Sequence, residues 1–172
     1  MTHDQILTRR IRLLTWLFIL ALVLSGVSAI PILAELDWLL NVLGAEAAGG
    51  PSSSSPWMAW LFQVRTGLRA TRNQYPFLFY GTDWLAFGHL MIAIAFIGAL
   101  RDPVRNRWLY SFGMIACALV IPYALIFGAI RGIPLWWRLI DCLFGVCGFV
   151  PLWLCRKWSR EVEMLSLTRQ RS

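Results

Sequence analysis

The chain is poor in charged residues. Only 15% of its 172 residues are Asp, Glu, Lys or Arg, and nine of these are acidic. A soluble domain is about 25% charged and roughly 45–50% apolar, whereas this chain is 58% hydrophobic. This composition excludes an ordinary soluble domain and predicts an all-α integral membrane protein.

Cysteine is scarce and lacks the spacing of a redox motif. None of the four cysteines forms a C-x-x-C pair, and Cys142 and Cys147 are five residues apart. On a helix that spacing separates the two side chains by about 140°. The cysteines are therefore interpreted as buried, inert thiols, and we expect no disulfide.

Histidine is scarcer still, since only His3 and His89 are present. Zinc needs a cluster of His, Cys or carboxylate ligands, and phosphate-binding loops and nucleophile elbows are absent from the sequence. Haem between the two histidines of one chain is excluded, because the topology below puts them on opposite membrane sides. We predict no metal and no cofactor, with a haem on His89 alone or a quinone as the alternative.

Four segments are apolar enough, and nearly all long enough, to cross a hydrocarbon core that takes about 20 helical residues. They are residues 13–33, 82–100, 108–130 and 135–155. The sequence thus predicts four transmembrane helices in one domain, 13–155, between tails at 1–12 and 156–172. An alternative concerns the first segment, because residues 1–29 resemble a cleavable signal. The apolar run continues to Leu33, which favours a retained helix.

Basic residues gather in three clusters beside these segments, and four spans put all three on one side of the membrane. Lys and Arg mark the cytoplasmic side, so both tails are expected in the cytoplasm, and we expect a bacterial inner membrane. The net charge of +7 is explained by this orientation, and no nucleic-acid partner is predicted. The clusters are Arg9, Arg10 and Arg12; Arg101, Arg105 and Arg107; and Arg156, Lys157 and Arg160.

The connection at 34–79 is predicted to be extracytoplasmic and partly helical. A first helix is indicated by leucines at helical spacing, a flexible Gly/Ser-rich linker covers 49–56, and a second helix is expected from Pro56, with Ser55 as its N-cap, to a stop at Pro76. This second helix is amphipathic. It is expected to lie in the headgroup region or to pack on the outer ends of the spans. Its apolar face comprises Trp57, Trp60, Leu61, Val64 and Leu68.

Small residues mark the predicted packing faces of the last two spans. Each residue of a helix advances about 100°, so same-face positions can be identified, and small residues allow close helix approach in membranes. The predicted packing positions are Gly113, Cys117 and Gly128 in the third span and Gly145 and Gly148 in the fourth.

Five polar residues could converge in a pocket in the outer half of the bundle. Asp83 is expected as the N-cap of the second span. His89, roughly 9 Å deeper, is either a functional group or a neutral ring that donates to a backbone carbonyl. Asp141 is expected to face a neighbouring helix with Arg138 as its nearest partner. The candidate pocket comprises Asp83, His89, Arg131, Arg138 and Asp141.

No enzyme class fits these residues well. A two-aspartate hydrolase would need Asp83 and Asp141 to share a proton, but the arginines beside them favour two ionised carboxylates. We therefore expect a non-enzymatic accessory, scaffold or lipid-interacting component of the bilayer, with a second copy or another membrane protein as its partner. The alternative is a binding or catalytic protein that uses His89, Asp141 and Arg138 for a lipid, quinone or haem.

Overall fold

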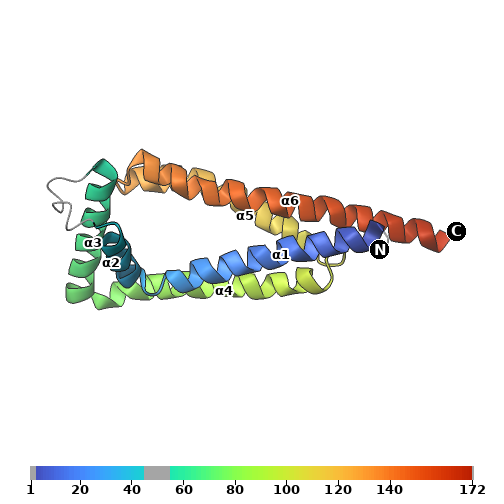
Figure 1. The fold of residues 1–172 in the computed structure, drawn as a ribbon, viewed down its shortest axis with the longest axis horizontal. Coiled ribbons are helices and arrows are strands. Elements are labelled where there is room, and N and C mark those ends of the chain that lie inside the picture. Colours follow the sequence, from blue (N-terminus) through green and yellow to red (C-terminus); the bar gives the residue numbers. More distant parts are fainter. Residues whose placement is uncertain (1–2, 45–54, 172) are drawn as a thin grey trace. The chain divides into compact units, whose positions relative to one another are not determined.

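A computed structural model of the chain describes residues 3–44 and 55–171, with side chains up to residue 168. Over these residues the chain forms six α-helices and one 3₁₀ turn, with no strand (Figure 1). The elements are α1 (His3–Ser28), α2 (Ile32–Val42), α3 (Pro56–Gln74), η2 (Pro76–Phe79), α4 (Tyr80–Arg101), α5 (Arg107–Ile130) and α6 (Leu135–Arg171).

Four of the helices are long and apolar enough to cross a membrane. They are α1, α4 together with the η2 turn before it, α5, and α6 as far as Thr168. The prediction of an all-helical chain with four such segments is therefore confirmed for the described part of the chain. The predicted linker at 49–56 lies outside the described residues except for its last two positions.

The chain divides into two compact units. The terminal unit comprises Met1–Ala21 and Ile92–Ser172, and the central unit comprises Leu22–Met91. Because the boundaries fall inside α1 and α4, each of these helices contributes residues to both units.

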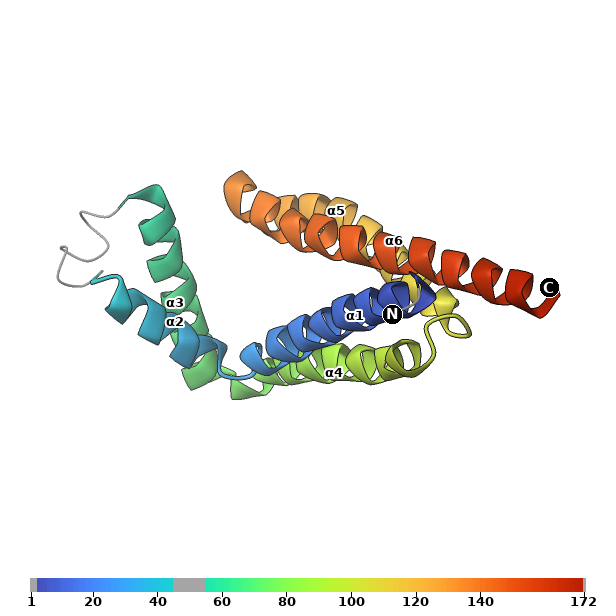
Figure 2. The same ribbon diagram turned by 45° about the vertical axis from the view of Figure 1, so that its right-hand side comes forward.

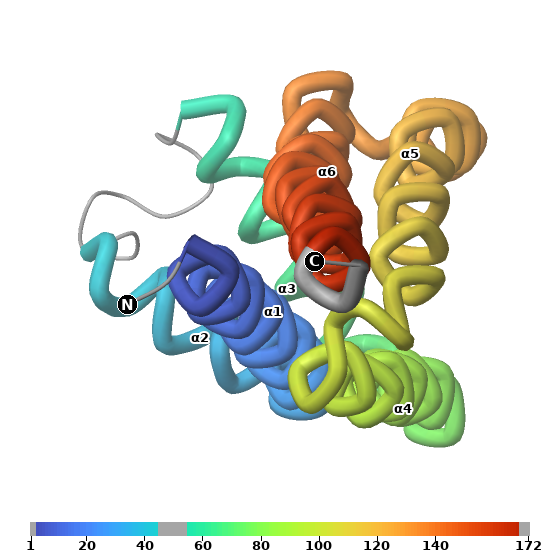
Figure 3. Tube along the Cα trace, turned by 90° about the vertical axis from the view of Figure 1, so that its right-hand side faces the viewer, coloured from blue at the N-terminus to red at the C-terminus, as the bar shows by residue number. Residues whose placement is uncertain are grey.

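The terminal unit is built on the α5–α6 pair, whose helices lie side by side (Figures 1 and 3). A short turn joins them. Gly132 there has a φ of +70°, which glycine adopts without strain, and the Ile133 amide donates to the Gly128 carbonyl at 2.8 Å. Residues from α1, α4, α5 and α6 form the core of this unit: Ile11, Phe96, Ala99, Leu109, Tyr110, Leu152 and Cys155.

The central unit contains α2 and α3, which contact one another (Figure 2). Their buried residues are Leu33, Leu36 and Leu40 on α2 and Leu61 and Phe62 on α3. The predicted start of α3 at Pro56 is confirmed, with Ser55 in the N-cap position, although its side chain makes no capping hydrogen bond. The first span differs from expectation. The helix ends at Ser28 and a new one begins at Ile32, because Pro31 lacks an amide hydrogen and disfavours helix in the residue before it.

One helix start was predicted wrongly and one helix is longer than its predicted span. Asp83 is not the N-cap of its helix. The turn at Pro76–Phe79 leads directly into α4 at Tyr80, so Asp83 lies in the first helical turn. The α6 helix continues past residue 155 to Arg171, giving 37 residues.

Candidate functional site

The five residues of the predicted polar pocket are divided between the two units. Asp83 and His89 belong to the central unit, whereas Arg131, Arg138 and Asp141 belong to the terminal unit. Their convergence in one pocket therefore stays a prediction. Within each unit, the local contacts of each side chain are defined.

His89 is half-buried and bonded to its own helix. Its Nδ1 lies 2.8 Å from the Leu85 carbonyl oxygen one turn earlier. Because a carbonyl oxygen can only accept, Nδ1 donates this hydrogen bond. The backbone of α1 passes close by, since a Cβ placed on Gly26 would lie 2.9 Å from the His89 Cβ. His89 thus sits at a tight crossing of two helices.

Asp83 shares α4 with His89 but not its face. Six residues separate them, which puts the two side chains about 120° apart around the helix. Asp83 is exposed, and its place in the first turn puts its carboxylate near the positive end of the helix dipole. This position accounts for the aspartate without a ligand.

Arg138 lies across α5. A Cβ on Gly128 would come within 2.5 Å of the Arg138 Cδ and 2.6 Å of its Cγ, so the stem of the arginine fills the space that the glycine leaves. At its tip, Nη1 donates to the Leu125 carbonyl at 3.2 Å. Its Nε is buried and has no partner among the described residues. Arg138 therefore joins α6 to α5 through both its apolar stem and its charged head.

The expected pairing of Arg138 with Asp141 is not made. The ion pairs between described residues do not include Asp141, and the guanidinium of Arg138 is directed at the α5 backbone instead. Asp141 is half-buried on α6, and Arg131 is exposed at the C-terminal end of α5. Among the described residues, none of the ion pairs involves Arg131, Arg138 or Asp141.

The five small residues predicted to pack are all found at close approaches within the terminal unit. A Cβ on Gly145 would lie 2.5 Å from the Cys117 carbonyl oxygen, and one on Gly148 would lie 2.8 Å from the Cys117 Sγ. A Cβ on Gly113 would meet a Leu152 methyl at 2.7 Å, and Gly128 faces Arg138 as described. Small side chains on both helices let their backbones approach, as is typical of membrane helix pairs.

A buried polar cluster that the sequence did not predict joins α1, α5 and α6. The Thr15 hydroxyl lies 2.9 Å from the Tyr110 hydroxyl, and both residues are fully buried. Thr15 also donates to the Ile11 carbonyl at 2.8 Å, and the Cys155 Sγ lies 3.7 Å from the same carbonyl oxygen. The available signal was a polar residue inside each apolar segment, but spacing along a helix cannot reveal partners on other helices.

Side chains of the same region donate hydrogen bonds to carbonyls at the C-terminal end of α4. The last four carbonyls of a helix have no partner within it. Here the Tyr110 hydroxyl donates to the Ala99 carbonyl at 3.3 Å, and the Asn106 amide donates to the Gly98 carbonyl at 3.0 Å. Arg12 reaches from α1 to the Arg101 carbonyl at 3.4 Å. Side chains from two other helices therefore satisfy this helix end.

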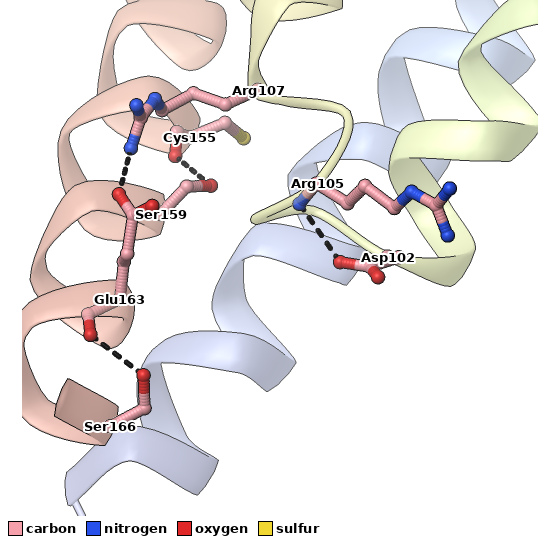
Figure 4. A network of polar contacts seen from close by, with 7 residues as sticks. All are labelled: Asp102, Arg105, Arg107, Cys155, Ser159, Glu163 and Ser166. Atoms are coloured by element: carbon pink, nitrogen blue, oxygen red, sulfur yellow. Dashed lines mark hydrogen bonds and ion pairs between the residues drawn. The ribbon is translucent and has the colours of Figure 1, made fainter.

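One ion pair and two hydrogen bonds lie in the loop between α4 and α5 and along the C-terminal part of α6. Figure 4 shows Arg107, at the start of α5, paired with Glu163 of α6, and the Arg105 amide donating to Asp102 at 3.0 Å. Nearby, the ring of His3 on α1 lies 2.9 Å from the Glu161 carboxylate. These partly exposed pairs hold the C-terminal part of α6 against the start of α5 and the start of α1.

The described residues contain no group of three or more His, Cys, Asp or Glu side chains placed to hold a metal ion. A surface depression of about 340 Å³ is lined by residues of one face of α1, and none of the five predicted pocket residues lines it. Comparisons with protein families, curated proteins and solved structures find no match to this chain.

Proposed function

We propose that the protein is a non-enzymatic component of the bilayer, a scaffold or accessory subunit whose four apolar helices span the membrane. Its partner is a second copy of the chain or another membrane protein. In the proposed topology both termini lie in the cytoplasm of a bacterial cell, and α2 and α3 lie on the outer side.

One observation carries this proposal. Arg138, a charged residue in the first turn of the apolar part of α6, is used for packing, because its stem fills the gap over Gly128 and its head binds the Leu125 carbonyl. Charged residues within membrane helices usually mark ligand or ion paths. An arginine that holds two helices together supports a structural role instead.

The polar cluster of Thr15, Tyr110 and Cys155 supports the same interpretation. The Thr15 hydroxyl donates to the Ile11 carbonyl of its own helix, and the Tyr110 hydroxyl lies within hydrogen-bonding distance of both Thr15 and the Ala99 carbonyl of α4, to one of which it donates. In a membrane, where polar groups have no water to bind, a hydrogen bond between two helices contributes about 0.6–2 kcal/mol to their association. The cluster therefore fixes the arrangement of helices in the terminal unit.

Native mass spectrometry of the protein extracted gently from its own membrane tests the proposal. We expect a species heavier than the 19.6 kDa protomer by one or more whole polypeptides. A bare protomer would contradict a scaffold role. Loss of the first 29 residues would identify a cleaved signal and reduce the spans to three.

A second candidate function follows from His89. Its Nδ1–H bond to the Leu85 carbonyl orients the ring, and in the neutral form Nε2 is the acceptor that can bind a metal or a quinol hydroxyl. For this candidate, the same spectra would show a protomer carrying a small molecule of constant mass. His89→Ala would remove that mass while the folded amount of protein stays unchanged. An optical spectrum of the sample distinguishes haem from a lipid or quinone.

A further inference from the structure

The exposed side of α1 changes from basic to apolar within one helical turn. Arg9, Arg10 and Arg12 are exposed near the start of the helix. From residue 13 to residue 21 every exposed residue is apolar, and Thr15, the one polar residue of this stretch, is fully buried. All of these positions belong to the terminal unit. The exposed apolar residues are Leu13, Trp16, Leu17, Leu20 and Ala21.

Two of the arginines share a face of the helix with Trp16. Arg9 lies seven residues before Trp16 and about 20° from it around the helix. Arg12 lies four residues before Trp16, which corresponds to about 40° around the helix and about 6 Å along its axis. Arg10 is off this face, at about 120° from Trp16. We call Arg9 and Arg12 the arginine pair of α1.

The surface depression on α1 adjoins the arginine pair. Arg9 and Arg12 line it together with Asp4, Gln5 and Thr8, so its lining carries two positive charges and one negative charge. Asp4 is the one acidic residue of α1. It lies about 12 Å along the axis before Arg12 and about 140° around the helix from Arg9. The end of the depression nearer the span is therefore the positive end.

The protein does not neutralise the arginine pair. Among the described residues, no ion pair involves Arg9 or Arg12. Arg12 donates to the Arg101 carbonyl at 3.4 Å, but a guanidinium has five N–H donors, so most of them stay available. The acidic residues in the neighbouring loop and on α6 contact other groups. They are Asp102, Glu161 and Glu163.

A positive pair directly beside an apolar helix surface is complementary to an amphiphile with an anionic head. Arginine binds phosphate oxygens with two parallel N–H groups. A free phosphate ion would occupy the arginines and leave the apolar residues uncovered. A phospholipid covers both, because its phosphate lies in the headgroup layer while its acyl chains run along the span. Basic residues beside a span attract anionic lipids for this reason.

We propose that Arg9 and Arg12 bind the phosphate group of an anionic phospholipid. Its acyl chains lie along the exposed apolar side of α1, which begins with Leu13 and Trp16. Tryptophan suits this position because its ring is apolar and its N–H can reach the headgroup layer. The assignment rests on the proposed membrane-spanning role of α1, and in the proposed topology the lipid belongs to the cytoplasmic leaflet.

Native mass spectrometry with defined lipids tests the proposal. The full-length protein in detergent receives equal amounts of phosphatidylglycerol and phosphatidylcholine with the same acyl chains, and the ratio of the two lipids is measured among protomers that carry one lipid. Wild type is compared with Arg9→Gln, Arg12→Gln and the matched control Arg10→Gln. Arg9→Gln is the cleaner test, because Arg12 also binds the Arg101 carbonyl. Far-UV circular dichroism shows whether each variant keeps its helices.

Wild type should carry phosphatidylglycerol in preference to phosphatidylcholine. Arg9→Gln and Arg12→Gln should each lower this ratio about fivefold, the factor that one arginine contributes near an anionic lipid surface, whereas Arg10→Gln should leave it unchanged. Equal losses in all three variants would show only diffuse attraction and would overturn the site. A wild type without any preference would overturn it as well.

Inorganic phosphate distinguishes a lipid from a free anion. Added at the ionic strength of a chloride control, it should leave the lipid ratio unchanged. Displacement of phosphatidylglycerol by phosphate would show that the acyl chains contribute nothing, and would overturn the assignment to a lipid.

Spin-labelled phosphatidylcholine tests the membrane-spanning role separately. In vesicles that contain wild type, the label should show a motionally restricted component from lipid in contact with the spans. Its absence would contradict the spanning role itself. Its presence, together with no preference for phosphatidylglycerol, would overturn the lipid site alone.

Discussion

Gly145→Ala should push α5 and α6 apart. The new Cβ would lie 2.5 Å from the Cys117 carbonyl oxygen and 2.7 Å from a Val120 methyl, whereas ordinary contact begins at 3.4 Å. The first neighbour is backbone, so the deficit of about 0.9 Å cannot be relieved by rotating a side chain. Overpacking of this kind costs about 1–3 kcal/mol. Alanine regains about 1 kcal/mol of helix propensity, which leaves a net loss of up to about 2 kcal/mol.

Gly88→Ala provides the matched control. Gly88 also lies inside an apolar candidate span, but nothing lies within 4 Å of a Cβ placed on it. The same chemical change therefore leaves only the propensity gain, and stability should be unchanged or raised by up to about 1 kcal/mol.

Unfolding in mixed micelles with increasing SDS, followed by far-UV circular dichroism, measures both variants against wild type. Gly145→Ala should unfold at a lower SDS fraction than wild type, and Gly88→Ala at an equal or higher one. If Gly145→Ala matched or exceeded Gly88→Ala, the close α5–α6 approach at this glycine would be refuted.

Three further predictions concern polar contacts. Tyr110→Phe and Thr15→Val should each destabilise the protein by about 1 kcal/mol, and the double variant should lose less than the sum, because both changes remove the same 2.9 Å hydroxyl contact. SDS titration of wild type, the two single variants and the double variant measures this coupling, and strictly additive losses would contradict the contact. Arg138→Ala should lower the free energy of unfolding by roughly 1–3 kcal/mol, because it leaves a gap over α5, whereas Arg138→Met keeps an apolar stem and should recover most of this loss in the same titration. Equal losses in the two variants would show that the stem does not pack. Asp37→Asn should weaken the 2.7 Å contact with Arg69 of α3 by no more than about 1 kcal/mol, because both groups are partly exposed. The difference between wild type and variant in the resistance of α3 to protease should become smaller at high salt, and a difference that salt leaves unchanged would argue against the ion pair.

The sequence was sufficient to predict the long helices and the start of α3. Apolar runs of about 20 residues identify candidate spans by length alone, and Pro56 after Ser55 is a local signal that needs no tertiary information. Glycines repeated at helical spacing identify a face on the helix itself, and the structure has Gly145 and Gly148 at close approaches between helices.

The sequence was insufficient where a residue depends on another helix. Arg138 is nearest in sequence to Asp141, but its head reaches the Leu125 carbonyl, thirteen residues away on α5. Thr15 and Tyr110 are 95 residues apart, and each alone looks like an ordinary polar residue in an apolar segment. Asp83 was assigned as an N-cap because the preceding Pro76 turn, which starts the helix earlier, has no strong helical pattern of its own.

The contacts of Thr15 with Tyr110 and Cys155 can form only after the later helices have been synthesised. The α1 helix is synthesised before α5 and α6, since Tyr110 lies 95 residues after Thr15, and Cys155, which approaches the same Ile11 carbonyl, comes still later. In the proposed membrane-spanning role, α1 would enter the lipid without these neighbours. The Ile11 carbonyl of the same helix accepts a hydrogen bond from the Thr15 hydroxyl at 2.8 Å, so this polar group is satisfied within α1 alone. In the proposed membrane-spanning role, the Thr15 hydroxyl would therefore destabilise α1 in the bilayer only slightly before α5 and α6 are made.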